Sequence, residues 1–384
     1  MKSRAMLVTV VLLLAVLAGS TYAAEPPIAA IAWQSATLTL IERDADYGRM
    51  LRLGDGRLAC VFDRDRKIWV RHSADEGRRW APPVLIAAEP ECWLTNAAAI
   101  SLRGGKLLCF WNERPLAAVK HQHRPAPAGG LTRPILIRMA ASDDLGATWS
   151  PPRTIYTAGP SFEDGCWEPA PLELPSGELH VYFANERPYQ TTAEQEISLL
   201  RSYDQGGAWS EAQKVALRTG RRDGMPTPLL LPDGRGIIVA IEDNGLSGDA
   251  FKPAIVFTPL SDNWGSGAVD GASSRRWGAL QQPLEPACYG GAPFLAKLPS
   301  GLTLLSYQES ADGTLENCRL AVCLGGPDGT NFAAKTYPLA GLAEPGQCWN
   351  SLCVKNDATV TAVSRATING VRGVWAIDGI LQRQ

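Results

Sequence analysis

Short runs of alternating apolar and polar residues recur along the chain, separated by stretches rich in Gly, Pro, Asp and Ser. Clear examples are residues 68–71, 135–138 and 197–200. An alternation with a period of two is typical of half-buried β-strands. No stretch sustains the longer period of an amphipathic helix, and 37 Gly and 28 Pro residues can supply many tight turns. The pattern therefore predicts an all-β fold.

The string Ser-x-Asp-x-Gly-x-x-Trp follows each of these three runs, at residues 73–80, 142–149 and 202–209. Its Asp can accept backbone N–H groups within a turn, and its Gly can adopt a positive φ. Its Trp supplies a large apolar ring that can pack beneath the turn. We therefore interpret Asp75, Asp144 and Asp204 as residues that stabilise the fold, not as residues that contact a substrate.

A second pattern occurs in six copies, each of which opens on an aromatic residue or Gly and leads into an apolar strand. The copies begin at Tyr47, Trp93, Trp167, Gly224, Tyr289 and Trp349. Repeated units of about four short strands predict a six-bladed β-propeller. We expect residues 36–41 to pair with the last unit near residues 374–377, because an open ring would leave unpaired strand edges.

Residues 1–23 have the features of a secretory signal peptide. Lys2 and Arg4 precede an apolar run from Met6 to Leu17, which is too short to span a bilayer comfortably. We expect residues 24–384 to form a single propeller domain that is secreted or periplasmic and monomeric. A formal net charge of −2 gives no reason to expect a nucleic acid or a membrane as a partner.

Cysteine and histidine do not indicate a metal site in this sequence. The chain has nine Cys and four His, and no Cys-x-x-Cys pair occurs. We therefore expect no metal and no cofactor. The odd number of cysteines leaves at least one of them without a disulfide partner.

The innermost strands of a propeller converge on its axis. We therefore expect two sets of residues to face one central funnel: those that open each unit and those that end the second strand of each unit. Aromatic rings can stack on sugar rings, and amides, carboxylates and guanidinium groups can bind sugar hydroxyls. The sequence therefore predicts a saccharide-binding site. Its predicted substrate-binding residues are Arg49, Asp63, Trp93, Asn96, Asn112, Trp167, Arg222, Asp223, Tyr289, Tyr307 and Trp349.

Two glutamates at such positions are candidates for catalysis. Glu168 opens the third unit and Glu242 ends the second strand of the fourth unit, so both should face the axis from adjacent blades. Hydrolysis of a glycosidic bond needs one carboxylic acid and a second carboxylate opposite it. Burial would raise the pKa of the residue that serves as the acid. Taken singly, either glutamate could equally be a structural hydrogen-bond acceptor.

The Ser-x-Asp-x-Gly-x-x-Trp string resembles the Asp-box, or BNR repeat, of the sialidase superfamily. Within that superfamily, residues 160–245 resemble the exo-arabinanases of glycoside hydrolase family 93. The resemblance implies a six-bladed propeller that releases arabinobiose from arabinan with retention, with Glu168 and Glu242 as the catalytic pair. It does not assign the acid and the nucleophile between them.

Two alternatives to this function remain open from the sequence. An exo-sialidase would grip the substrate carboxylate with three arginines, for which Arg49 and Arg222 are candidates, but the fifth unit offers no arginine at its opening. A propeller of this kind could also bind glycans without catalysis.

Overall fold

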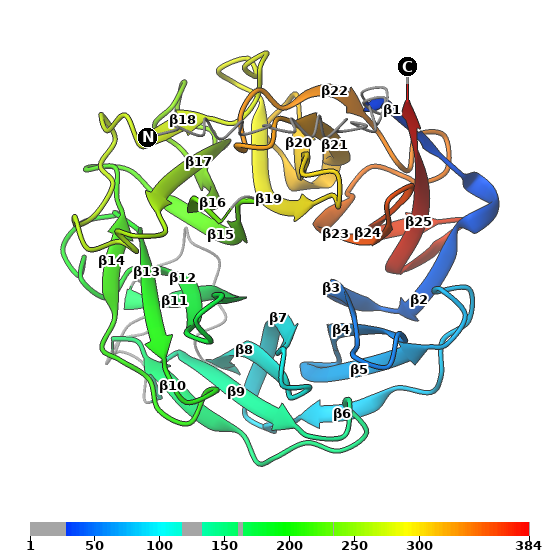
Figure 1. Ribbon diagram of the computed structural model, residues 1–384, viewed down its shortest axis with the longest axis horizontal. Coiled ribbons are helices and arrows are strands. Elements are labelled where there is room, and N and C mark those ends of the chain that lie inside the picture. The colour runs from blue at the N-terminus through cyan, green and yellow to red at the C-terminus, as the bar shows by residue number, and fades with distance from the viewer. Residues whose placement is uncertain (1–27, 117–132, 160–163, 233, 384) are drawn as a thin grey trace, which may run out of the picture.

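The computed structural model describes residues 28–116, 133–159, 164–232 and 234–383. They form six antiparallel sheets that are arranged as blades around one central axis (Figure 1). The six-bladed, all-β prediction is thus confirmed. The first three blades, in order from the innermost to the outermost strand, consist of β3 (Ala45–Arg52), β4 (Leu58–Arg64), β5 (Lys67–Ser73) and β6 (Val84–Ala87); β7 (Cys92–Ser101), β8 (Leu107–Pro115), β9 (Leu136–Ser142) and β10 (Arg153–Thr157); and β11 (Cys166–Glu173), β12 (Leu179–Asn185), β13 (Glu196–Ser202) and β14 (Gln213–Ala216).

The remaining blades repeat this order, and the last blade gains two strands from the start of the described chain. Short 3-10 turns, among them η1 (Ser35–Thr37) and η4 (Leu315–Asn317), connect some strands. The strands are β15 (Asp223–Leu230), β16 (Gly236–Asp243), β17 (Lys252–Pro259) and β18 (Arg276–Gly278); β19 (Tyr289–Lys297), β20 (Thr303–Ser310), β21 (Arg319–Gly325) and β22 (Ala333–Thr336); and β23 (Cys348–Asn356), β24 (Thr359–Ile368) and β25 (Val371–Arg383), with β1 (Ile28–Trp33) and β2 (Thr39–Arg43) paired to β25.

The ring is closed by strands from opposite ends of the chain. Thr39 of β2 pairs with Ala376 of β25, and Ile31 of β1 pairs with Leu381. In Figure 1 the blue N-terminal strands lie beside the red β25. The predicted pairing of residues 36–41 near residues 374–377 is confirmed. The expected signal peptide, residues 1–23, lies outside the described residues, so this segment and the exported location remain predictions.

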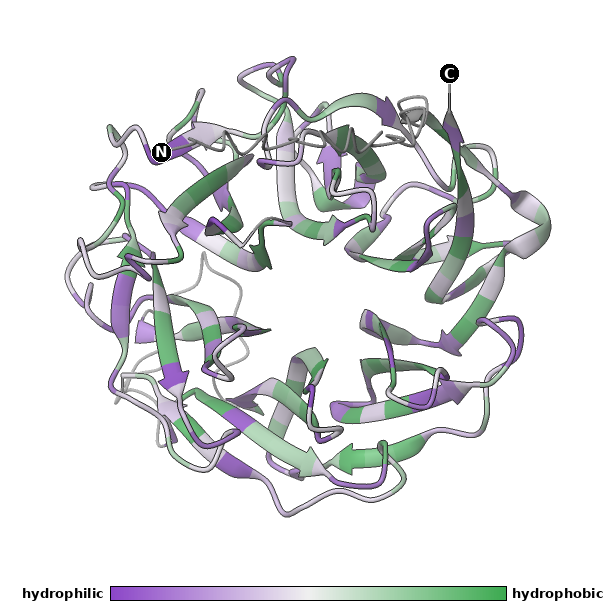
Figure 2. Ribbon diagram, in the orientation of Figure 1, coloured by the Kyte–Doolittle hydropathy of each residue, from purple (hydrophilic) through white to green (hydrophobic). Residues whose placement is uncertain are grey.

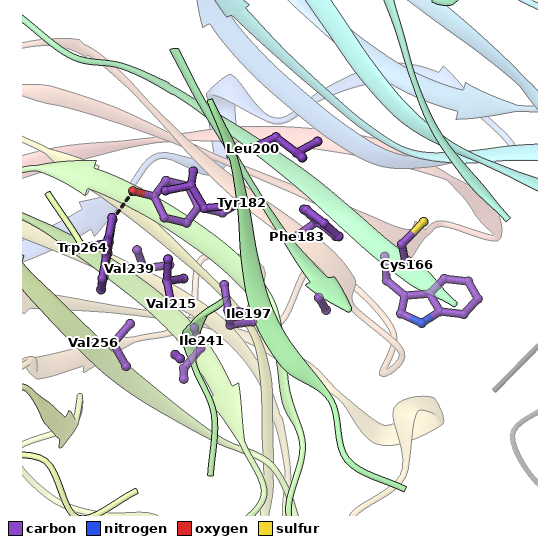
Figure 3. Close-up of a cluster of buried hydrophobic side chains, with 14 of the residues drawn as sticks. Cys166, Tyr182, Phe183, Ile197, Leu200, Val215, Val239, Ile241, Val256 and Trp264 are labelled. Atoms are coloured by element: carbon purple, nitrogen blue, oxygen red, sulfur yellow. Dashed lines mark hydrogen bonds between the residues drawn. The ribbon is translucent and has the colours of Figure 1, made fainter. Parts of the chain in front are cut away.

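Buried apolar residues cluster between neighbouring blades. In Figure 2 the strands carry most of the hydrophobic colour, and hydrophilic colour is frequent in the outer turns. The contact between the third and fourth blades is shown in Figure 3, where Tyr182, Phe183 and Trp264 are buried among branched aliphatic residues. The indole Nε1 of Trp264 donates a hydrogen bond of 2.9 Å to the hydroxyl of Tyr182, which keeps these buried polar atoms paired. Among the described residues, no helix has the length and apolar character needed to cross a membrane.

The Asp-box strings form the turns that connect the third and fourth strands of the first three blades. In the second blade, the hydroxyl of Ser142 donates to Asp144 at 2.8 Å and accepts the N–H of Gly146 at 2.8 Å. The indole of Trp149 donates to the carbonyl of Gly146 at 3.2 Å. Gly146 has a φ of 87°, which a residue with a Cβ would adopt only at a cost. These contacts give Asp144 the structural role that the sequence analysis predicts.

We predict that Ser142→Ala lowers the free energy of unfolding by about 1–2 kcal/mol, because it removes two hydrogen bonds from a buried hydroxyl. Urea unfolding monitored by tryptophan fluorescence would measure the change. The exposed Ser35 provides a matched control, since Ser35→Ala should leave the unfolding midpoint unchanged. Equal midpoints for both variants would show that the hydroxyl of the Asp-box does not stabilise the blade.

Candidate active site

Each of the six innermost strands contains a β-bulge, in which two residues oppose one residue of the neighbouring strand. The register shifts between Asp46 and Arg49 in the first blade and between Gly224 and Thr227 in the fourth, and the other blades repeat it. The first residue of each bulge has a positive φ, and none of these residues is Gly. They are Tyr47 (51°), Asn96 (59°), Glu168 (51°), Met225 (47°), Ala292 (48°) and Trp349 (58°).

The six bulge residues lie around the propeller axis. Tyr47 stacks on Trp349 with ring centroids 4.7 Å apart, and Met225 and Ala292 pack with Tyr47. On the other side of the axis, the amide Nδ2 of Asn96 donates to Oε1 of Glu168 at 3.4 Å. An axial cavity of about 140 Å³ is lined by the innermost strands of the first five blades, including Tyr47, Asn96 and Glu168. The bulges therefore bring one carboxyl group to an otherwise largely apolar centre.

A side chain from the second strand of one blade binds the main chain of the bulge in the next blade. The side-chain oxygen of Asn112 accepts the N–H of Glu168 at 2.9 Å, and that of Gln308 accepts the N–H of Trp349 at 2.8 Å. Oε2 of Glu242 accepts the N–H of Ala292 at 2.9 Å. Amides perform this task in two blades, so the task itself does not require the carboxyl group that Glu242 provides.

Two glycines leave room for the carboxyl group of Glu242. A Cβ on Gly224 would lie 2.9 Å from Oε1 of Glu242, and a Cβ on Gly291 would lie 2.6 Å from Oε2. The same Cβ on Gly291 would lie 2.0 Å from the hydroxyl of Tyr289. Larger residues at these two positions would displace the carboxyl group, so the glycines help to define its place.

The environments of the two glutamates raise both pKa values. Burial raises the pKa of Glu168 to about 8, and the negative charge of Glu242 adds to the shift. Burial also raises the pKa of Glu242 to about 7, opposed by the hydrogen bond from the Ala292 N–H and by the charge of Arg222. At neutral pH, Glu168 therefore holds its proton more firmly than Glu242 does.

Four predicted substrate-binding residues, Trp93, Trp167, Tyr289 and Asp63, lie close to this pair, together with Arg114. Trp93 is 36% exposed, and the guanidinium of Arg114 lies over both its ring and the ring of Trp167. The hydroxyl of Tyr289 accepts a hydrogen bond of 3.1 Å from Gln308. Burial, followed by the charge of Asp46, raises the pKa of Asp63 to about 7.

The two arginines considered for a carboxylate grip are bound to the protein itself. Nη1 of Arg49 donates to the carbonyls of Gly48 and Trp349 at 3.2 and 3.1 Å, within the axial cavity. Arg222 forms an ion pair with Glu186. The placement of Arg49 beyond the bulge, on the cavity wall, explains why it turns toward main-chain carbonyls.

Three predicted substrate-binding residues are not available to a substrate. Asn112 is fully buried, and its amide also donates to the carbonyl of Cys166 at 2.8 Å, so it positions the strand that carries Glu168. Asp223 is fully buried in an ion pair with Arg276 at 2.5 Å. Tyr307 is fully buried between the fourth and fifth blades and donates to Glu309 at 2.8 Å.

The error at Tyr307 arises from strand alternation. Its neighbour Gln308 faces the sixth blade, where it accepts the N–H of Trp349, so Tyr307 must face the fourth blade on the other side of the strand. The same alternation identifies a residue that the sequence analysis missed: Arg114 follows Asn112 by two positions on β8 and lies on the same side of the strand. The roles of Gln308 and of the two glycines at Glu242 depend on contacts between blades, which no local pattern in the sequence shows.

Comparison with known proteins agrees with this architecture. Residues 131–288 match the family described as a BNR repeat-like domain. Among curated protein sequences, none matches the chain significantly. Several solved structures share its fold. A protein of unknown function from Dyadobacter fermentans superimposes with a TM-score of 0.67 and 15% identity, over 91% of this chain and 100% of that chain.

Glycosidases are among the similar structures. The family 93 α-L-arabinofuranosidase of Fusarium graminearum, solved with arabinobiose, has a TM-score of 0.64 and 17% identity, over 90% of this chain and 98% of that chain. The Hadza microbial sialidase Hz136 has a TM-score of 0.60 and 14% identity, over 88% of this chain and 66% of that chain. The predicted resemblance to the sialidase superfamily and to glycoside hydrolase family 93 is thus confirmed at the level of the fold: the chain has the propeller fold of these structures.

We predict that Glu242→Gln lowers the pKa of Glu168 below its value of about 8, because it removes the negative charge that most strongly opposes ionisation. The glutamine keeps a side-chain oxygen for the Ala292 N–H, as Gln308 does for Trp349. Carboxyl ¹³C NMR titration would measure the change. The exposed Glu211 supplies the control variant, Glu211→Gln. An unchanged pKa of Glu168 would mean that the two carboxyl groups do not act as a pair.

Proposed function

We propose that this protein is an exo-acting, retaining glycoside hydrolase with Glu168 and Glu242 as its catalytic pair. One observation carries the proposal: Glu242 has an ionisable carboxyl group at a position where Asn112 and Gln308 have amides in other blades. The amides bind the main chain of the next bulge equally well, so the structural contact does not require a carboxyl group. Its charge acts on Glu168, which the left-handed bulge directs toward the axis. Glycosidic hydrolysis requires a protonated carboxyl group beside an ionised one, and the higher pKa of Glu168 makes this pair suited to it.

The environments of the two residues support the following roles. Glu168 has the higher pKa and serves as the general acid, which protonates the oxygen of the leaving sugar. Glu242 accepts a main-chain N–H, which favours its charged form, and serves as the nucleophile at the anomeric carbon. Glu168, now deprotonated, then removes a proton from the water that hydrolyses the glycosyl-enzyme.

The surroundings of the pair support an exo-acting enzyme. The axis is filled by four side chains that pack against one another, those of Tyr47, Met225, Ala292 and Trp349. An extended polysaccharide could therefore not pass along the axis, and only the end of a chain would reach the pair. Trp93, which is 36% exposed, offers a ring for a sugar unit near the acid, whereas Trp167 is buried. The structural likeness to an arabinofuranosidase solved with arabinobiose makes linear arabinan the first substrate to test.

Exo-sialidase activity and binding without catalysis are the alternatives. Arg49 and Arg222, the arginines considered for a sialidase-like grip, already bind main-chain carbonyls and Glu186. This favours a different glycosidase over a sialidase. The raised pKa values of Glu168 and Glu242 favour catalysis over simple binding, because a binding site gains nothing from carboxyl groups that are costly to bury.

We predict that the wild-type protein releases a short product from the end of linear arabinan or a related glycan, and that Glu168→Gln and Glu242→Gln each lower kcat by about 10²–10⁴-fold or more. Product release is measured by anion-exchange chromatography, with sialyl-lactose as a second substrate. Glu211→Gln should retain full activity. Wild-type-like activity in either catalytic variant, with the fold intact, would exclude the proposed pair.

We predict a narrow optimum of kcat/KM near neutral pH. The rate rises as Glu242 loses its proton at about pH 7, and it falls as Glu168 loses its proton at about pH 8. Both apparent pKa values belong to the coupled pair. Initial rates across this range would measure the profile. An optimum near pH 5 would contradict this prediction, because it would mean that the two carboxyl pKa values lie close to those of ordinary exposed carboxyl groups.

A further inference from the structure

Arg114 lies near the end of β8, against the rings of two tryptophans. Its guanidinium carbon lies 5.6 Å from the ring centroid of Trp93 and 5.8 Å from that of Trp167. Trp93 belongs to the same blade and pairs with Arg114 across the strands, whereas Trp167 precedes Glu168 in the next blade. Two aromatic rings thus hold the planar group in one orientation beside the catalytic acid.

The guanidinium of Arg114 has no polar partner among the described residues. Its Nε is buried without a hydrogen-bond acceptor, and no carboxylate in this part of the chain lies within ion-pair distance. The two arginines considered for a carboxylate grip, by contrast, have polar partners. Arg49 donates to two main-chain carbonyls, and Arg222 pairs with Glu186.

The charge of Arg114 reaches the catalytic centre. It acts on Tyr47, Asp63 and Glu168, although it bonds to none of them. Because Glu168 and Asp63 retain protons near neutral pH, they do not fully balance this positive charge. A partly buried guanidinium without a partner is costly, and a bound anion would offset that cost.

We propose that Arg114 binds a carboxylate of the substrate, and that this site therefore accepts a saccharide with an acidic sugar unit, such as a uronic acid. This inference rests on the proposed glycosidase function, whose substrate class it narrows. Two terminal N–H groups held in a fixed plane match the two oxygens of a carboxylate. A neutral sugar hydroxyl would accept one hydrogen bond and leave the charge unbalanced.

Binding of acidic sugars and their matched neutral forms tests the proposal directly. Isothermal titration calorimetry would compare the dissociation constants of di-galacturonate and glucuronate-bearing disaccharides with those of their methyl esters, which lack only the charge. We expect the wild-type protein to bind at least one acid about tenfold or more tightly than its ester. Arg114→Gln should remove this difference, by weakening the binding of the acid to the level of the ester. Arg114→Lys keeps a charge without the planar fork, and should recover only part of the difference.

The chain offers a matched control for this experiment. Arg187 also lies over an aromatic ring, that of Tyr156 at 5.9 Å, but it donates to the carbonyl of Thr157. Arg187→Gln should retain the preference for the acid. Equal affinity of the wild-type protein for all acids and their esters would overturn the proposal, as would a preference that survives in Arg114→Gln. A preference only for a sulfated disaccharide would likewise overturn the carboxylate assignment.

Hydrolysis of the same compounds separates this proposal from the proposed function. Cleavage of neutral arabinan that is unaffected by Arg114→Gln, without any preference for acids, would support the glycosidase and reject the acidic substrate. Charge-dependent binding through Arg114 without hydrolysis of any compound would support the acidic ligand and reject the glycosidase. The dependence of binding on ionic strength is a second test of the charge interaction, because raising the salt concentration should weaken binding of the acid and not of the ester.

Discussion

The left-handed residue at the start of each inner bulge is the constraint on which the candidate site depends. A residue other than glycine in this conformation costs about 1 kcal/mol or more, and the propeller accepts that cost six times around one axis. The cost is offset where neighbouring blades bind the bulge main chain, as Asn112 does at Glu168. The same local geometry, repeated in every blade, turns six side chains toward a single point.

This repeated position makes the chemistry of the centre adjustable without changing the fold. The six bulge residues include aromatic, aliphatic, amide and acidic side chains on equivalent backbone. Only Glu168 among them carries an ionisable carboxyl group. The position of Glu242 is likewise one of a repeated set, in which Asn112 and Gln308 perform the structural task. Replacing an amide by a carboxyl at such a position adds little structural benefit and a large electrostatic cost, which is the trade-off expected of a functional site.

The outer parts of the propeller provide the rigidity that this centre requires. Asp-box turns tie the third and fourth strands of three blades, through hydrogen bonds such as that from Ser142 to Asp144. Strands β1 and β2 complete the last blade at its outer edge by pairing with β25, so that strands from both ends of the chain close the ring. Because the blades cannot separate, cross-blade contacts such as Glu242 to Ala292 keep their geometry.

The sequence by itself determined the repeat, and the repeat determined the fold: three Asp-boxes and six strand units already predict six blades and a closed ring. It also singled out Glu168 and Glu242, because charged residues interrupt strands that are otherwise apolar. Only the tertiary structure decided which neighbours share a cavity. Tyr307 and Gln308 differ by one position along β20, yet they face opposite sides of the strand. Asp223 meets Arg276, and Arg114 meets Trp167, across distances in sequence that no local pattern encodes. Local periodicity records the conformation of a strand, whereas ion pairs, burial and pKa values depend on contacts between blades that exist only after the ring has closed.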